Sequence, residues 1–130
     1  MPGCARSICR RCAKRHSGDA VIEVFFRYRV HPAQTRAFEH AYGPAGPWAQ
    51  LFKCDPGYRR TRLFRHKADE HIYISIDVWD SKEAYDRFRS EHADEYRRLD
   101  AQLAMLKLEE HLLGYYEGDD EYRVPIDALA

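Results

Sequence analysis

The chain has 130 residues, which is enough for one domain with a modest hydrophobic core and too few for two independent domains. Its 21 basic and 21 acidic side chains balance, so no overall field favours nucleic acid or an anionic membrane as a partner. No stretch reaches the roughly 20 apolar residues that span a bilayer, and the basic N-terminus lacks the apolar segment of a secretory signal. We therefore expect a cytoplasmic protein that binds neither nucleic acid nor a membrane.

Residues 1–19 differ in composition from the rest of the chain. Five basic side chains accompany a single acidic one there, and no hydrophobic periodicity is present, which predicts a disordered basic tail. The four soft ligands Cys4, Cys9, Cys12 and His16 are in principle able to surround a zinc ion. Structural zinc sites usually consist of two close pairs of ligands, and this spacing differs, so we expect no metal site.

Ordered structure is expected from residue 20 onward. Residues 21–30 alternate large apolar side chains with more polar ones, which predicts a long strand. Pro32 then begins a helix over residues 33–42, and Pro47 begins a shorter helix over residues 47–53, because proline at the first helical position costs no hydrogen bond.

Two further strands follow as a hairpin. The turn at residues 54–57 leads into a strand over residues 58–66, and a charged loop leads back into a strand over residues 71–79. The returning strand has two clearly different faces. One face carries Ile72, Ile74, Ile76 and Val78, and the other carries Tyr73, Ser75, Asp77 and Trp79.

The main helix comes directly after this strand. Asp80 or Ser81 is positioned to cap it, and Glu83 completes a capping pattern. Apolar and aromatic side chains then recur every three or four residues as far as Leu103, which predicts a helix with a break near Asp100. Residues 111–117 are predicted to form a last strand. The acidic residues 118–130 are interpreted as an arm that reaches over a neighbour or as a disordered tail.

This order of elements predicts the fold class. Strand, helix, strand, strand, helix, strand is the ferredoxin-like split βαβ pattern, an α+β fold with a four-stranded antiparallel sheet and helices on one face. The other face has no cover from its own chain, although the strands carry large apolar groups on both sides. Because monomers rarely expose large apolar areas, we predict a homodimer in which two sheets pack face to face.

The segment Trp79-Asp80-Ser81-Lys82-Glu83-Ala84-Tyr85, at a junction of strand and helix, resembles the antibiotic biosynthesis monooxygenase (ABM) family. The resemblance extends over about residues 21–117 and identifies residues 20–117 as the domain. It implies a dimeric α+β barrel in which each protomer holds a pocket between its sheet and its helices. It also implies cofactor-independent oxygenation of aromatic compounds as one of the activities of the family.

Only some of the site residues known in the family have counterparts in this sequence. The asparagine, tryptophan and tyrosine that the anthrone oxygenases of the family use correspond here to Ser75, Trp79 and Tyr85, so the two aromatic residues are kept and the asparagine is lost. The residues that haem-degrading members require are not matched, and we expect no haem.

Oxygenation without a cofactor requires an apolar slot for a flat ring, a base that favours the substrate anion, and exclusion of water. We predict His92 as the base because its ordinary pKa lies near neutrality, with Trp79 and Tyr85 as its catalytic partners. The predicted substrate-binding residues are Trp48, Tyr73, Ser75 and Tyr28.

Each of these residues also has a structural interpretation. His92 is equally typical of a half-buried histidine bonded to a neighbour, and the aromatic residues are equally typical of a core. Two hypotheses therefore remain. The first is a monooxygenase that uses molecular oxygen and an electron-rich aromatic substrate, quinol-like or anthrone-like, without a cofactor. The second is a dimeric module on the same fold that binds a small ligand, or acts in regulation, without catalysis.

Overall fold

The computed structural model describes residues 20–118. It contains one antiparallel sheet with the strand order β2-β3-β1-β4. The strands are β1 (Ile22–Val30), β2 (Tyr58–Arg65), β3 (Ile72–Trp79) and β4 (Lys107–Glu117). The predicted tails, with the possible zinc ligands of the first one, lie outside the described residues apart from Gly118.

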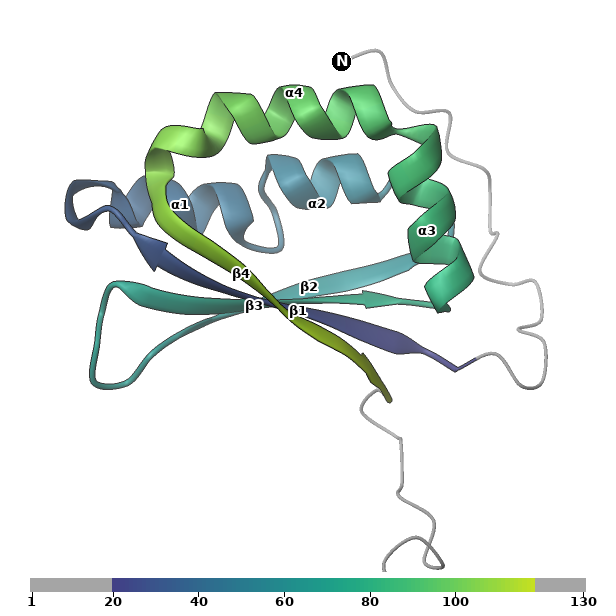
Figure 1. Cartoon of the computed structure of the whole chain (residues 1–130), viewed down its shortest axis with the longest axis horizontal. Helices are drawn as coiled ribbons and strands as arrows, with labels where there is room; N and C mark the ends of the chain where they lie inside the picture. The colour runs from purple at the N-terminus through teal and green to yellow at the C-terminus, as the bar shows by residue number, and fades with distance from the viewer. Residues whose placement is uncertain (1–19, 119–130) are drawn as a thin grey trace, which may run out of the picture.

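The helices all lie on one side of the sheet (Figure 1). They are α1 (Thr35–Tyr42), α2 (Pro47–Phe52), α3 (Lys82–Glu91) and α4 (Ala93–Leu103), with short 3-10 turns η2 (Pro32–Gln34) before α1 and η3 (Ala104–Leu106) after α4. This arrangement confirms the predicted α+β, ferredoxin-like fold with helices on one face.

Two boundaries differ from the prediction by four residues or more. The main helix is interrupted at His92, which ends α3 and precedes α4, instead of near Asp100. The last strand begins at Lys107, four residues before the predicted start at His111. Ser81 does cap α3, because its hydroxyl accepts a hydrogen bond from the backbone N–H of Ala84 at 3.1 Å.

The register of the sheet decides which face of β3 meets the helices. Ser75 lies opposite Phe26 of β1, and both residues belong to the face on which the helices pack. Tyr73 and Trp79 on the same face of β3 are buried in the main core. The face of β3 that carries Tyr73, Ser75, Asp77 and Trp79 therefore points toward the helices.

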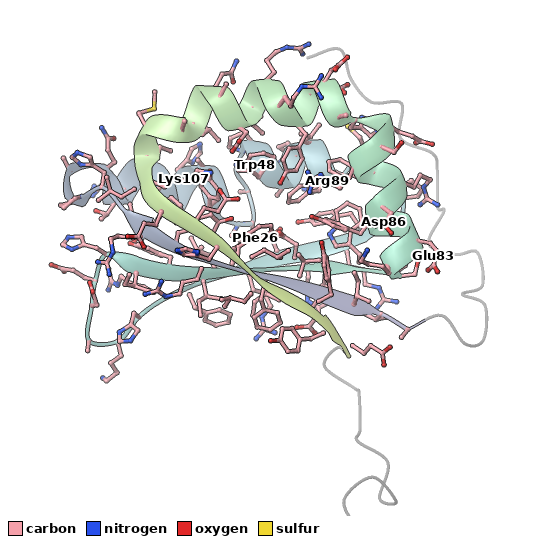
Figure 2. All side chains as sticks on the ribbon, viewed as in Figure 1. Phe26, Trp48, Glu83, Asp86, Arg89 and Lys107 are labelled. Carbon is pink, nitrogen blue, oxygen red and sulfur yellow. The ribbon has the colours of Figure 1, made fainter. Side chains whose placement is uncertain are left out.

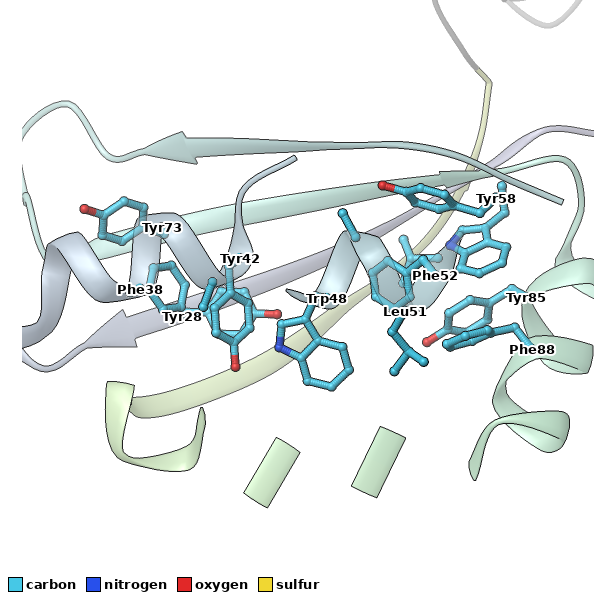
Figure 3. Packing of buried hydrophobic residues seen from close by; sticks show 14 of the residues in the cluster. Tyr28, Phe38, Tyr42, Trp48, Leu51, Phe52, Tyr58, Tyr73, Tyr85 and Phe88 are labelled. Carbon is cyan, nitrogen blue, oxygen red and sulfur yellow. The ribbon is translucent and has the colours of Figure 1, made fainter. Parts of the chain in front are cut away.

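The main core is dominated by aromatic rings. Trp79 is fully buried, and its ring centroid lies 5.2–5.6 Å from four other ring centroids, those of Phe52, Tyr58, Tyr85 and Phe88. Figure 3 shows the same aromatic packing continuing from α2 across the sheet toward α3. Close aromatic contacts of this kind add stabilisation beyond simple area burial, so this end of the core holds β3 firmly to α3.

An ion pair between the half-exposed Arg87 and the buried Asp55 fixes α3 against the turn that precedes β2. The carboxylate of Asp55 accepts hydrogen bonds from Nε and Nη2 of Arg87 at 2.9 and 2.7 Å, and from the backbone N–H of Gly57 at 2.7 Å. The approach is so close that a Cβ at Gly57 would lie 2.5 Å from Cβ of Ala84. Glycine is therefore required there for α3 to pack on the turn.

The opposite face of the sheet forms a second, smaller apolar cluster. Val21, Ile76 and Val78 are buried in it, with Phe25 and Ile74 packed alongside. Among residues 20–118, no helix covers this face (Figure 1). We name this cluster the outer face.

Candidate functional site

A pocket lies between the helix-facing side of the sheet and the helices. Its volume is about 380 Å³, which includes its opening to solvent. Figure 2 shows Phe26, Trp48 and Lys107 around the space between the sheet and α4. The complete lining is Phe26, Tyr28, Tyr42, Trp48, Phe52, Thr61, Ser75, Asp77, Tyr96, Asp100, Lys107 and Glu110.

The enclosed part of this pocket is small. In the described conformation it admits about one water molecule. Among the lining aromatic side chains, Phe26 and Tyr96 are only half-buried, whereas Trp48 and Phe52 are buried. Entry of an aromatic ring therefore requires movement of the half-buried side chains at the opening.

Asp77 is a buried carboxyl group in the floor of this pocket. Its Oδ1 accepts a hydrogen bond from Oγ1 of Thr61 at 2.7 Å, and no cation among the described residues pairs with it. Burial raises the pKa of Asp77 to about 7, although the hydrogen bond from Thr61 acts to lower it. The carboxyl group therefore changes charge near neutral pH, as a general base requires.

Thr61 continues a chain of hydroxyl groups that ends on Asp77. The hydroxyl oxygens of Thr61 and Tyr58 are 2.7 Å apart. Because Thr61 has one hydroxyl proton and donates it to Asp77, Tyr58 donates to Thr61 while the carboxyl group is ionised. Burial raises the pKa of Tyr58 to about 12, so its hydroxyl keeps its proton at neutral pH.

Tyr28 and Ser75 provide the other polar groups beside Asp77. The hydroxyl of Ser75 donates to that of Tyr28 over 3.5 Å, which is a long hydrogen bond. Burial raises the pKa of Tyr28 well above its ordinary value, so this phenol also stays neutral. Both hydroxyls are consequently able to orient an oxygen of a bound molecule without adding charge.

Lys107 closes one edge of the pocket. Its ammonium group donates to Oδ1 of Asp100 at 3.1 Å and to Oε1 of Glu110, and it lies 5.8 Å from the ring centroid of Tyr28. Burial acts to lower the pKa of Lys107, but the contacts with Glu110 and Tyr42 raise it overall. The cation therefore stays charged and is already paired with two carboxylates that are not Asp77.

The structure places three of the predicted site residues in the pocket lining. These are Tyr28, Trp48 and Ser75. Tyr73 lies apart from them, and its hydroxyl donates to Oε2 of Glu39 at 2.5 Å.

The three predicted catalytic residues lie together around Phe88, outside the pocket lining. Trp79 is in contact with both Tyr85 and Phe88, and His92 stacks on Phe88 with 5.3 Å between the ring centroids. Nδ1 of His92 is buried without a hydrogen bond and lies 3.6 Å from Oε1 of Glu95. These side chains therefore form a group one layer behind the pocket.

Sequence reasoning missed the two residues with the clearest chemistry, Asp77 and Thr61. The signal for Asp77 was present, because it is the one acidic side chain on the face of β3 that carries Tyr73, Ser75 and Trp79. An acid on the helix-facing side of a strand is buried once the register is known, and burial of a carboxyl group raises its pKa. Thr61 had no comparable signal because the alternation of β2 is irregular.

Two other kinds of site are not found in residues 20–118. No group of three or more histidine, cysteine or acidic residues there is arranged to hold a metal ion. Within the same range, none of the helices combines the length and apolar character that crossing a membrane demands.

Comparison with known proteins gives a family and a fold. The sequence model of the family described as antibiotic biosynthesis monooxygenase matches residues 21–99. No curated protein matches the chain. Among solved structures, SnoaB, a cofactor-independent oxygenase from Streptomyces nogalater, is 22% identical with a TM-score of 0.54, and the match covers 82% of this chain and 97% of that one.

A second structure gives the same result at lower identity. A Nitrosomonas europaea protein, provisionally named an antibiotic biosynthesis monooxygenase, is 13% identical with a TM-score of 0.60, over 82% of this chain and 97% of that one. At such identities the likeness concerns the fold alone. The family model, in contrast, matches more than half of the sequence, and this chain therefore belongs to the antibiotic biosynthesis monooxygenase family.

Proposed function

We propose that this protein is a cofactor-independent monooxygenase that oxidises an electron-rich aromatic compound, quinol-like or anthrone-like, at the pocket below α4. The observation that carries the proposal is an aromatic pocket with a buried carboxyl group, Asp77, that no cation among the described residues pairs with. Membership of the family and a fold like that of SnoaB support oxygenation as the reaction class.

The reaction needs no external reductant. Loss of a proton turns an anthrone or quinol into an anion that reduces molecular oxygen directly. For an anthrone-like ring, the methylene carbon is oxidised to a carbonyl, one oxygen atom enters the product, and the other leaves as water. The protein has to hold the ring, favour the anion and exclude bulk water.

In this proposal some of the predicted residues contact the substrate, and the others support the residues that do. Tyr28, Trp48 and Ser75 contact the substrate, because they line the pocket. Trp79 and Tyr85 act from the layer behind, where Trp79 contacts Phe52 at 5.6 Å between ring centroids. The prediction that His92 is the base remains to be tested by His92→Ala, which removes the imidazole without touching the pocket lining.

The test measures oxygen consumption by purified protein, treated with a chelator, on a panel of anthrones and hydroquinones. We expect saturable uptake above the rate of spontaneous oxidation, with a lower rate for Trp48→Phe because the slot changes shape. Arg97→Gln, on the exposed side of α4, is the matched control and should keep the rate of the unchanged protein. Absence of turnover across the panel would contradict the proposal.

The small enclosed volume favours one alternative, a non-catalytic module that binds a small ligand. On this alternative an aromatic compound binds saturably to the pocket and is recovered unchanged in the presence of oxygen. Equilibrium binding measured beside oxygen uptake, on the same compounds, separates the two functions.

We also propose that two copies pair through the outer face of the sheet. The cluster of Phe25, Ile74, Ile76 and Val78 is apolar, and Phe64 beside it keeps 45% of its surface exposed. A second copy placed on this face would cover the parts of Phe25, Ile74 and Phe64 that are exposed in the single chain, as the dimeric barrel of the family requires.

Ile74→Asp tests the pairing, because it places a charge in the centre of the outer face. We expect a dimer to become a monomer of about 15.3 kDa in light scattering. Met105→Asp, at a side chain that is 63% exposed on the helical side, is the control and should remain dimeric. A monomeric unchanged protein, or a dimeric Ile74→Asp, would contradict this interface.

A further inference from the structure

We propose that Asp77 is the proton acceptor of the pocket, and that Thr61 and Tyr58 set its proton affinity through a chain of hydrogen bonds. This inference rests on the proposed oxygenase function and names the base that the function requires. It assigns a role to residues that neither the family resemblance nor the sequence pattern singled out.

The position of the carboxyl group supports this role. Asp77 lies in the floor of the pocket beside Ser75 and Tyr28, where the enclosed space has room for about one water molecule between the carboxyl group and a molecule held at the opening. One of its oxygens, Oδ1, is taken by the hydrogen bond from Thr61, and Oδ2 accepts no hydrogen bond from the described residues. Oδ2 is therefore the oxygen of Asp77 that can accept a proton from a bound molecule.

The hydroxyl groups of Tyr58 and Thr61 both point their hydrogen bonds toward Asp77. Tyr58 donates to Thr61, and Thr61 donates to Oδ1, so both O–H dipoles point toward the carboxylate. Such donors stabilise the ionised form and limit how far burial raises the proton affinity. The chain thus keeps a buried carboxyl group available as a base near neutral pH, whereas burial alone would keep it protonated.

The charged and titratable groups around Asp77 leave it as the group that can accept a proton near neutral pH. Three tyrosines of the lining, Tyr28, Tyr42 and Tyr96, have their pKa raised by burial and stay neutral. Tyr58 and Tyr85, which interact with Asp77 electrostatically, are raised by burial as well. The remaining charged groups of the lining are Asp100, Lys107 and Glu110, and they bond to one another.

His92 is less well placed for this role. It does not line the pocket, its ring stacks on Phe88, and its Nδ1 is buried next to Glu95. Of the two candidate bases, Asp77 is therefore the one that lines the pocket and is placed to accept a proton from a ring bound there. The small enclosed space also suits the transfer, since one water molecule is enough to connect the carboxylate with a ring held at the opening.

With an anthrone-like substrate, Asp77 gains one proton and gives it back in each reaction cycle. The carboxylate takes a proton from the methylene carbon, and the electron pair stays on the ring as an anion. The anion reduces molecular oxygen and combines with it, and the resulting peroxide receives the proton back from Asp77. Loss of water from this hydroperoxide forms the carbonyl and leaves the carboxylate ready again.

The test begins in the resting protein. Infrared spectroscopy follows the carboxyl band of Asp77 as a function of pH, identified as the band that Asp77→Asn removes. Addition of 4-nitrophenol, which is not oxidised and is mostly ionised at pH 8, should increase this band, because the bound phenolate favours the protonated form of Asp77 and the carboxyl group takes up a proton from the solvent. Binding of the phenol with no change in the band, or no binding at all, would overturn the inference.

Turnover provides the second readout. On an anthrone that the protein oxidises, Asp77→Asn should lower kcat by about 100-fold or more, which is the usual contribution of a general base. Thr61→Val keeps the shape of the side chain and removes its donor, so the acid limb of the pH profile should move by about one unit toward alkaline pH. Asp94→Asn, on the exposed side of α4, should leave both quantities unchanged.

The outcomes separate this inference from the proposed function. If Asp77 becomes protonated when 4-nitrophenol binds but no anthrone or quinol is oxidised, the oxygenase function fails and the proton acceptor stands. If oxidation occurs and Asp77→Asn retains the full rate and the original pH profile, the function stands and Asp77 is not its base.

Discussion

Asp77→Asn should stabilise the protein against unfolding at pH 8 and leave its stability unchanged near pH 3. Burial raises the pKa of Asp77 from 3.8 to about 7, so the folded protein holds a proton in this interval that the unfolded chain has lost. The stability of the unchanged protein therefore falls as pH rises from about 4 to about 7, by an amount on the order of 4 kcal/mol.

Asparagine removes this loss of stability at higher pH because its side chain is neutral at every pH. Its side-chain oxygen still accepts the hydrogen bond that Thr61 donates to Asp77 at 2.7 Å, so the shape and the contact are kept. Urea unfolding at a series of pH values measures the difference between the two proteins. We expect the difference to be near zero at low pH, to grow through the interval and to be constant above pH 8.

A matched control is available on α4. Asp94→Asn replaces a side chain that is 76% exposed and paired with Arg97, so its effect should be small and nearly independent of pH. Parallel stability profiles for Asp77→Asn and the unchanged protein would show that the carboxyl group has an ordinary pKa. In that case Asp77 would also lose its suitability as a base.

Trp79→Ala should destabilise the protein by about 3–5 kcal/mol, the usual cost of removing a large buried aromatic side chain. Trp79 is fully buried, and four aromatic rings from the flanking elements pack around it. Removal of the indole leaves a cavity between β3 and α3 that these rings cannot fill completely. Thermal or urea unfolding at a single pH measures the loss.

Trp79→Phe distinguishes a structural role from a catalytic one. The indole Nε1 is buried and makes no hydrogen bond with the described residues, so phenylalanine loses volume but no polar contact. We expect a loss of about 1–3 kcal/mol from the smaller ring, with the oxygen-consumption rate kept within a few fold. A folded, stable Trp79→Phe protein with no activity would instead show that the indole takes part in the reaction.

The fold was predictable because its strongest patterns are local. Alternation in residues 22–30 and 72–79 predicted the two central strands, and the cap at Ser81 predicted the start of α3. The break at His92 escaped prediction because the apolar spacing continues from Phe88 to Tyr96 across it. A single residue with φ −117° and ψ 31° separates α3 from α4 there, with neither glycine nor proline to mark the position.

The candidate site was only partly predictable. Tyr28, Trp48 and Ser75 could be named from residue type, from the alternation along the strands and from the family resemblance. Asp77 could not be separated from an exposed acid without knowledge of the register and of what packs above it. The chemistry of the pocket depends on tertiary burial, which alternation along one strand does not report.

The break at His92 also affects the size of the molecule that the pocket can admit. The helix before it, α3, contributes three buried residues and is fastened to the turn before β2 by Asp55 and Arg87. The helix after it, α4, roofs the pocket with Tyr96 and Asp100 yet contributes no buried residue. The side chains of α4 that cover the pocket are thus less deeply buried than those of α3, and we expect α4 to move, while the sheet keeps its place, when a larger molecule enters.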